Sequence, residues 1–432
     1  MIANVFFKTI HHFFPKLSVW LNTTDDPRQI NKITYKLSHL LWLGIFLFLV
    51  RLGSKRQIKY RLSTEEFRKN LCLFTGSYSE TIAHHDTLEN LLKKLNPDEI
   101  SMVRHKMINR LIRMKCLTAF RLLDKYYMVA IDATGHLVFK DRHCPYCLTK
   151  KKDGKILYYY HNVLEAKLVT ETGLALSIET EFIENNAIDT KQDCELKAFY
   201  RMIKRLKKKF PQLKICLLLD SLYSADPVIE LVEGYGWKYI TTFKKGSMPD
   251  TYQEYLSLKK LCPENKAEIK DGNIIQKFSW VNDISYRGPI FDVLECNESK
   301  PGSKGKIENT KFVWLTNLKV NKGNITKIAK GGRLRWKIEN EGFNIQKNRG
   351  YKLEHPFSQS EVAIKNFYLI LQIAHIISQL MEEGSLLKDK IEKVFGSITN
   401  VFLQLLEDLR TKFIGLEYRN LKPIQIRHTA PP

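Results

Sequence analysis

The sequence lacks a hydrophobic run long enough to cross a membrane. Its longest apolar stretch, residues 40–50, has 11 residues and is followed directly by Arg51, whereas a spanning helix needs about 20. The first residues also lack the apolar region and small-residue cleavage site of a signal peptide. We therefore interpret the stretch as a buried core helix and expect neither a membrane protein nor a secreted one.

Cysteine is scarce, and internal repeats and low-complexity tracts are absent. Eight cysteines in 432 residues, mostly isolated, do not form a disulfide framework and fit a reducing cytoplasm. The chain has room for two or three domains of about 150 residues, which can bury a core without disulfides. Its hydrophobic content of 44% is that of a globular protein rather than a disordered one.

Acidic residues are few relative to basic ones. There are 46 Asp and Glu against 69 Lys and Arg, so 69 − 46 gives a formal net charge of +23. A surplus of this size favours a polyanionic partner. Nucleic acid is the leading candidate, because each phosphate contact releases counterions, and an anionic membrane surface is the alternative.

Hydrophobic patterning predicts an α/β protein with helical regions at both ends. Apolar periodicity predicts helices at 36–50, at 97–115 after the cap Asn96, and at 362–380. Segment 249–310 is poor in helix signals, is expected to form an exposed hairpin or loop at 303–306, and is interpreted as an inserted β-rich lobe. The predicted organisation is a helical DNA-binding domain (1–120), a catalytic core in two parts (121–248 and 311–356) around that lobe (249–310), and a helical region (357–432).

Two aspartates each follow a buried strand. Asp132 comes after the β-rich run 127–131, and Asp220 comes after the apolar run 215–219. Ligands bind at the carboxyl ends of strands in sheets that are covered by helices, so both carboxylates are expected in a site. The alternative is that each Asp only caps the turn that follows it.

A third carboxylate is available downstream on a predicted helix. Segment 335–347 interleaves acidic and basic residues around apolar ones and contains Glu339 and Glu341. Taken alone, this composition also fits a solvated helix with i,i+4 ion pairs.

The ordered set of motifs resembles the DDE transposases of bacterial insertion sequences, in particular the insertion-sequence-four group. The resemblance rests on residues 131–135 around Asp132, on three leucines before Asp220 with Tyr223 behind it, and on Arg335 and Glu339. The spacings of 88 (220 − 132) and 119 (339 − 220) residues also suit it, and it covers about 126–354. It implies a ribonuclease-H-like mixed sheet with an inserted β-rich lobe, and cut-and-paste transposition by a homodimer on paired ends of double-stranded DNA in the bacterial cytoplasm, at the nucleoid.

The signature of that group departs here at two positions. It reads Tyr, two residues, Arg, three residues, Glu, six residues, Lys; Arg335 and Glu339 match, but Gly332 holds the Tyr position and Gln346 the Lys position. A one-residue insertion before Phe343 would restore the match to Lys347. The departure leaves Glu341 as a rival of Glu339 for the third carboxylate.

The resemblance implies a site that binds two Mg²⁺ ions, with Mn²⁺ as a substitute. Carboxylates are hard ligands for Mg²⁺, and two ions about 4 Å apart support an in-line phosphodiester displacement. Asp132 would bridge them, with Asp220 and Glu339 each completing one. Arg335 and Lys347 would hold DNA phosphates.

Other clusters allow a functional or a structural interpretation. Cys144 and Cys147 have CxxC spacing and His161 could join them, but a second ligand pair is missing, so both Zn²⁺ and incidental cysteines are considered. Phe312 and Trp314 alternate on a predicted strand and therefore share one face. Their rings are interpreted either as core packing or as a surface on which an unpaired base at a DNA end stacks. The run 84–86, His-His-Asp, suggests a metal cluster or helix capping by Asp86.

Two basic segments are candidates for DNA binding. The amphipathic helix at 194–209 is a candidate for contact with the DNA backbone. The N-terminal region is the candidate for specific binding of the element ends, with Arg51, Lys55, Arg56, Lys59 and Arg61 after its core helix. The rival functions are a nuclease that cuts without joining and a DNA-binding protein derived from a transposase without catalysis. Joined products would distinguish a transposase from the nuclease that only cuts. The intact Asp132, Asp220 and Glu339 count against the DNA-binding protein without catalysis.

Overall fold

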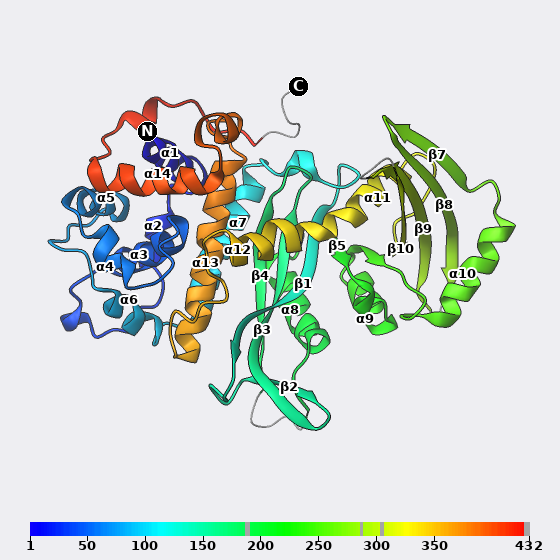
Figure 1. The fold of residues 1–432 in the computed structure, drawn as a ribbon, viewed down its shortest axis with the longest axis horizontal. Helices are drawn as coiled ribbons and strands as arrows, with labels where there is room; N and C mark the ends of the chain where they lie inside the picture. Colours follow the sequence, from blue (N-terminus) through cyan, green and yellow to red (C-terminus); the bar gives the residue numbers. More distant parts are fainter. Residues whose placement is uncertain (186–190, 286–287, 303–305, 427–432) are drawn as a thin grey trace.

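A mixed ten-stranded sheet extends from a helical body on one side to its own β-rich end, formed by β7–β10, on the other (Figure 1). The computed structural model describes residues 1–185, 191–285, 288–302 and 306–426. The predicted α/β class is confirmed.

The helical body joins the two ends of the chain. Helix α13 packs on α3 and α7, and α14 packs on α1 and α5, so segments 1–120 and 357–426 form one packed unit (Figure 1). The helices are α1 (Ile2–Phe13), α2 (Leu17–Asn22), α3 (Leu37–Leu49), α4 (Gln57–Leu62), α5 (Glu65–Thr75), α6 (His85–Leu92), α7 (Pro97–Arg113), α13 (Glu361–Glu382) and α14 (Ile398–Thr411).

Local signals placed the main helices of this body correctly. Every residue of α3 is buried, which confirms the predicted core helix. The Asn96 side chain caps α7 by accepting from the Asp98 N–H at 3.0 Å, with Pro97 at the first helical position. In the part of the chain that the structure describes, no helix is both long and apolar enough to span a bilayer.

The sheet runs in the order β2-β3-β1-β5-β6-β10-β9-β8-β7, with β4 paired to β3. Strands β5 and β6 run parallel to β1, and the other pairings are antiparallel. The strands are β1 (Tyr127–Phe139), β2 (Leu148–Lys152), β3 (Lys155–Val169), β4 (Ala175–Ile183), β5 (Ile215–Leu219), β6 (Lys238–Thr242), β7 (Lys266–Asp271), β8 (Ile274–Ser285), β9 (Ile290–Pro301) and β10 (Ile307–Thr316).

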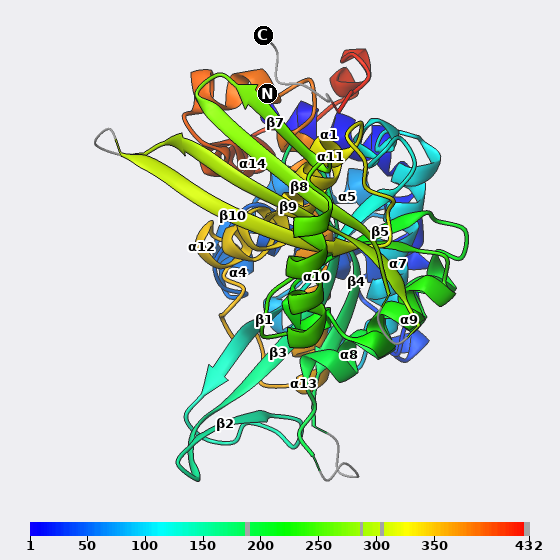
Figure 2. The ribbon, with the colours of Figure 1, turned by 90° about the vertical axis from the view of Figure 1, so that its right-hand side faces the viewer.

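The inserted segment is not purely β-rich and does not stand apart. It begins with helix α10 (Pro249–Leu261), which lies against β8 (Figure 2), and β10 then pairs with β6 so that the insert extends the central sheet. The low helix content expected here was wrong. Pro249 at the first turn and two lysines in the last turn were available start and stop signals. The loop predicted at 303–306 lies, apart from Lys306, outside the described residues.

Side-chain alternation divides the sheet into two buried faces. In β1, Tyr127, Val129 and Ile131 join one core with helices α8 (Glu195–Lys209) and α9 (Asp226–Gly234). Met128 and Ala130 join the other core with α11 (Ile325–Arg333) and the segment that follows it. Because successive side chains point to opposite faces, Asp132 falls on the α11 side.

Short helical turns complete the chain. They are the 3-10 turns η1 (Ile30–Lys32), η2 (Thr118–Phe120), η3 (Ser221–Tyr223), η5 (Leu334–Trp336), η7 (Lys388–Lys390) and η9 (Glu417–Asn420), the π-helical segments η6 (Ile338–Asn344) and η8 (Ile391–Phe395), and the short helix α12 (Ile345–Asn348). Segments α11, η5, η6 and α12 follow one another across one face of the sheet (Figure 1).

Candidate functional site

The two aspartates lie in register on neighbouring parallel strands. Strands β1 and β5 pair up to Ala130 and Leu218, and 218 − 130 equals 220 − 132, so Asp132 and Asp220 stand two residues beyond the same pair. Neighbouring strands lie about 4.8 Å apart, which brings the two carboxylates to one edge. Asp220 follows the end of β5 as predicted, but Asp132 does not end its strand.

Strand β1 continues to Phe139 because it pairs with β3 along its length after β5 has stopped. The buried run of β1 nevertheless ends at Ile131, and Asp132 keeps 25% of its side chain exposed. Both aspartates also accept local hydrogen bonds: Asp132 Oδ1 from the Ala133 N–H at 3.0 Å, and Asp220 Oδ1 from the Leu222 N–H at 2.8 Å. Each aspartate therefore both accepts a local backbone hydrogen bond and lies at the shared strand edge.

The third carboxylate is carried by η6, which lies over β1, β3 and β4. Ile338 and Phe343 are fully buried there. A close approach at Gly342 fixes the segment, because a Cβ at this position would lie 3.0 Å from the Lys167 side chain. This packing holds Glu339 toward Asp132.

The pKa of Asp132 reflects the charged groups that surround its carboxylate. The pKa of Asp132 is raised to about 6, chiefly by burial; the carboxylates of Asp220 and Glu339 also raise it, and Arg335 opposes them. Arg335 Nη1 lies 3.4 Å from Asp132 Oδ2. The site therefore concentrates negative charge that one arginine only partly balances.

Glu341 faces away from this cluster. Its carboxylate pairs with Lys337 at 3.0 Å and adds to the negative charge around Glu382. Of the two glutamates that the sequence left open, Glu339 is the one that acts on Asp132.

A π-helical segment carries Glu339 and ends just before Gln346 and Lys347, the two positions considered for the lysine of the signature. A π turn takes one more residue than an α turn, and η6 ends directly before α12, where Gln346 and Lys347 lie. Gln346 is fully buried and donates to Gln372 Oε1 at 2.9 Å. Lys347 is partly exposed and pairs with Glu354 at 3.2 Å, so Lys347 is the lysine available to a ligand.

Gly332 of α11, at the Tyr position of the signature, lies against the Trp314 side chain of strand β10. A Cβ on Gly332 would lie 2.5 Å from Trp314 Nε1, so the indole occupies the space that a side chain would need. Trp314 is only 3% exposed and stacks parallel to Phe312 with ring centroids 5.5 Å apart. Core packing thus describes Trp314, while Phe312 is half-buried at the edge of a groove.

That groove, with a volume of about 460 Å³, begins at Asp220 and is strongly basic. Its lining cations are Lys244, Lys245, Lys311, Arg333 and Arg335, of which the last three pair with Glu295, Glu298 and Asp132. The first two are exposed on the connection between β6 and α10. Sequence analysis missed them, although a Lys-Lys pair directly after a strand was a usable signal.

A fourth carboxylate was also missed. Glu195, in the first turn of α8, accepts a hydrogen bond from the Tyr223 hydroxyl at 2.7 Å. Burial raises its pKa, the Tyr223 bond opposes this, and Asp132 and Asp220 raise it. Glu195 therefore belongs to the same negative cluster, and an acidic residue opening a basic helix was its only signal in the sequence.

Several predicted DNA contacts are engaged within the protein. The Arg51 guanidinium lies 3.4 Å from the Tyr351 ring centroid and donates to the Phe48 carbonyl at 2.9 Å, and Lys55 pairs with Glu89. The interpretation of Arg51 as a DNA contact was wrong, because the guanidinium binds a core tyrosine instead.

Four of the seven basic side chains of α8 are likewise used internally, and one of them, Lys207, donates to the Pro211 and Tyr235 carbonyls at 3.0 Å. Arg201 pairs with Asp193, while Arg205 and Lys209 reach the buried Glu179, which also pairs with Arg104. Three further lysines of the helix stay exposed, at positions 197, 204 and 208. Only these remain free to follow a DNA backbone.

The donor chemistry at Asp132 suits a hard divalent cation, since the nearby carboxylates repel one another. Among the described residues, two sets of His, Cys, Asp and Glu have all their ligand atoms within 4.8 Å, and neither includes Asp132. One is the run 84–86, where His84 rather than Asp86 caps α6. The other is Cys144, Cys147 and His161.

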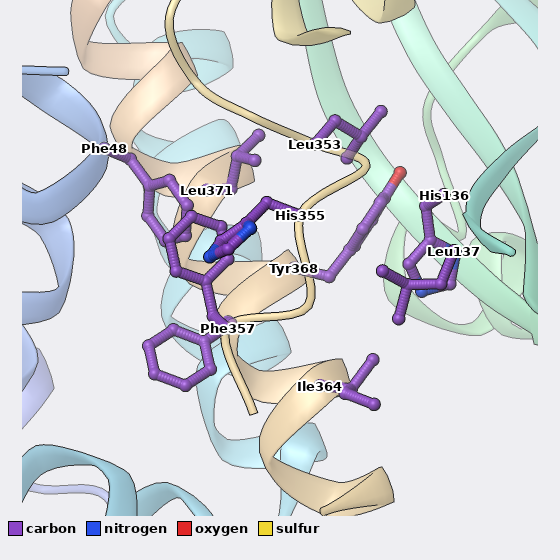
Figure 3. A pocket seen from close by; sticks show the side chains of 10 residues that line it. Phe48, His136, Leu137, Leu353, His355, Phe357, Ile364, Tyr368 and Leu371 are labelled. Carbon is purple, nitrogen blue, oxygen red and sulfur yellow. The ribbon is translucent and has the colours of Figure 1, made fainter. Parts of the chain in front are cut away.

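A second hollow lies between β1, α13 and the chain at 353–357 (Figure 3). Its volume of about 20 Å³ has room for about one water molecule. Its lining is mainly aromatic and aliphatic, as the side chains of Phe48, Phe357 and Leu371 show (Figure 3). We therefore assign the groove at Asp220, not this hollow, to ligand binding.

Comparison with protein-family models and with curated proteins finds no match to the chain.

Proposed function

We propose that the chain is a DDE-type transposase that cuts DNA at the ends of an element and joins them to a target. The observation that carries the proposal is the in-register pair Asp132 and Asp220, with Glu339 acting on Asp132 and a basic groove beginning at Asp220. A site of this kind combines negative charge for cations with positive charge for phosphates.

The proposal includes a ribonuclease-H-like core. The strand order β4-β3-β1-β5-β6 supports it, with three antiparallel strands followed by two that run parallel to β1. The strands β7–β10 would then be the inserted lobe, joined to the edge of the core at β6.

Asp132, Asp220 and Glu339 would hold the cations, and Glu195 is near enough to affect the same charge balance. Two bound Mg²⁺ ions, or Mn²⁺ in their place, would lower the pKa of the attacking water or 3′-hydroxyl and stabilise the leaving oxygen. Arg335 now neutralises Asp132. With cations bound, its guanidinium becomes free to hold a DNA phosphate by two parallel hydrogen bonds.

The DNA end would enter along the basic groove. Lys244 and Lys245 offer exposed charge for the backbone, and Lys347 adds a cation beyond η6. Phe312 is the aromatic ring at the groove edge on which an unpaired base could stack, with Trp314 behind it. Assembly as a homodimer on two ends is part of the proposal.

The test is an end-cleavage and joining assay with the full chain. The substrate is a labelled duplex carrying the inverted repeats that flank the gene, with a supercoiled plasmid as target and Mg²⁺ or Mn²⁺ present. Asp132→Asn, Asp220→Asn and Glu339→Gln should bind the duplex but lose cleavage by 10²-fold or more. Glu341→Gln is the matched control. Glu341 lies two residues after Glu339 and pairs with Lys337, so this variant should keep cleavage.

The other outcomes discriminate the rivals. Cleavage without joined products would replace the proposal with a nuclease. Binding without cleavage in either metal would indicate a DNA-binding protein without catalysis. Loss of activity in Glu341→Gln but not Glu339→Gln would refute the assigned third carboxylate.

A further inference from the structure

A compact Cys₂His cluster lies on the strand pair that carries Asp132, away from the carboxylates. Cys144 and Cys147 lie on the connection from β1 to β2, and His161 lies in β3. All three are buried, with 7%, 2% and 5% of their surface exposed. The cysteines are free thiols.

The three ligand atoms form a nearly equilateral triangle. Cys144 Sγ and Cys147 Sγ are 3.5 Å apart, and each lies 3.4 Å from His161 Nε2. Tetrahedral Zn²⁺ with Zn–S of about 2.3 Å and Zn–N of about 2.0 Å places two sulfur ligands about 3.8 Å apart and a sulfur and a nitrogen about 3.5 Å apart. The triangle is therefore a few tenths of an ångström from the size that a tetrahedral zinc ion requires.

The backbone around the cysteines has the form of a metal-binding turn. The Cys147 N–H donates to the Cys144 carbonyl at 3.4 Å, which closes the turn between the two cysteines. Asn185 fixes the turn from outside: its N–H donates to the Tyr146 carbonyl at 3.1 Å and its side chain to the Cys147 carbonyl at 2.8 Å. The thiols are thus held toward His161 before any ion binds.

We infer that Cys144, Cys147 and His161 form a structural Zn²⁺ site. Two thiolates neutralise the charge of the ion, which suits a buried position, and sulfur ligands select Zn²⁺ over Mg²⁺. The fourth ligand is water or His143, whose ring lies 6.1 Å from that of His161. The site is independent of the proposed DNA chemistry, because its ligands include none of the site carboxylates.

The position of the cluster indicates what the ion does. The hairpin of β2 and β3 projects from the sheet at the bottom of Figure 1, and its tip exposes lysines at 150, 151, 152 and 155. The ion joins the connection that enters this hairpin to β3 at its base. It therefore fixes the direction in which a four-lysine tip leaves the sheet.

The test is the metal content of the untagged full chain, purified without chelator from zinc-supplemented medium and measured by mass spectrometry. We expect one zinc per chain in the wild type, and loss of most of it in the double variant Cys144→Ser/Cys147→Ser and in His161→Gln. Cys216→Ser and Cys296→Ser are matched controls, since both replace buried cysteines outside the cluster. They should keep one zinc per chain.

A second measurement covers variants that fail to fold. Co²⁺ exchanged into the wild type should give the strong visible bands of a tetrahedral site and a thiolate charge-transfer band, and a mercurial reagent should release the zinc. Wild-type zinc far below one per chain, retained zinc in the double variant, a Cys144–Cys147 disulfide, or octahedral Co²⁺ bands would each overturn the inference.

Discussion

Replacing Asp132 by Asn is expected to stabilise the protein while it removes activity. The pKa of Asp132 is raised from 3.8 to about 6, chiefly by burial. A folded-state pKa above the unfolded value means that the folded state binds more protons between these pH values, so stability falls as pH rises through this window. At about 1.36 kcal/mol per pKa unit, the ionised carboxylate costs roughly 3 kcal/mol above pH 6.

An amide stays neutral at every pH and avoids this cost, and the pKa of about 6 already includes the attraction of Arg335, whose Nη1 lies 3.4 Å from Asp132 Oδ2. We therefore expect a net gain of about 3 kcal/mol at pH 7.5. With an unfolding entropy of about 2.1 cal/mol/K per residue, the chain of 432 residues shifts its Tm by roughly 1 °C per kcal/mol. The expected rise in Tm is thus about 3 °C.

The assay is differential scanning calorimetry of wild type and Asp132→Asn in metal-free buffers from pH 4 to pH 8. The difference in Tm should be near zero at pH 4, grow through pH 5, and level off above pH 6. Asp271→Asn, on the exposed edge strand β7, is the control and should show no such trend. A variant less stable than wild type at pH 7.5, or a difference independent of pH, would refute the reasoning.

Three further substitutions test the packing and charge around the site. Gly342→Ala should lower the free energy of unfolding by about 1–3 kcal/mol, measured in urea, because its Cβ would lie 3.0 Å from the Lys167 side chain. Gly332→Ala should destabilise by a similar amount through Trp314, and a double-mutant cycle with Trp314→Ala should recover part of the loss. Glu179→Ala should cost about 3–5 kcal/mol at pH 7. Burial raises the pKa of Glu179, but its cationic partners hold it below 4.5, so this stabilisation is present at neutral pH and is lost as pH falls through the folded pKa.

Each of these has a matched control. Gly234→Ala in α9 meets no atom within 4 Å and should stabilise by up to about 1 kcal/mol, as helical glycines usually do. If Gly342→Ala behaves in the same way, η6 is not fixed by Lys167. An additive cycle at Gly332 and Trp314 would show that the two do not share space. Glu308→Gln, an exposed glutamate on β10, should leave stability unchanged.

The sequence by itself determined the elements whose signals are local. The uniformly apolar run of α3, the Asn96–Pro97 start of α7 and the buried runs before Asp132 and Asp220 could all be read from neighbouring residues. Period-two alternation then placed both aspartates on one sheet edge, because parallel strands bring their carboxyl ends together. Hydrophobic burial imposes these patterns within a few residues.

Only the tertiary structure decided what depends on distant partners. Glu339 rather than Glu341 acts on Asp132 because η6 packs on Lys167 of β3, and the extra residue of that π segment puts Gln346 in the core. The Arg51 guanidinium is held by Tyr351, 300 residues away in the sequence (351 − 51). A lysine or glutamate carries no local sign of whether its partner is water, DNA or a buried opposite charge. The partner of such a side chain depends on which surfaces pack together in the folded protein.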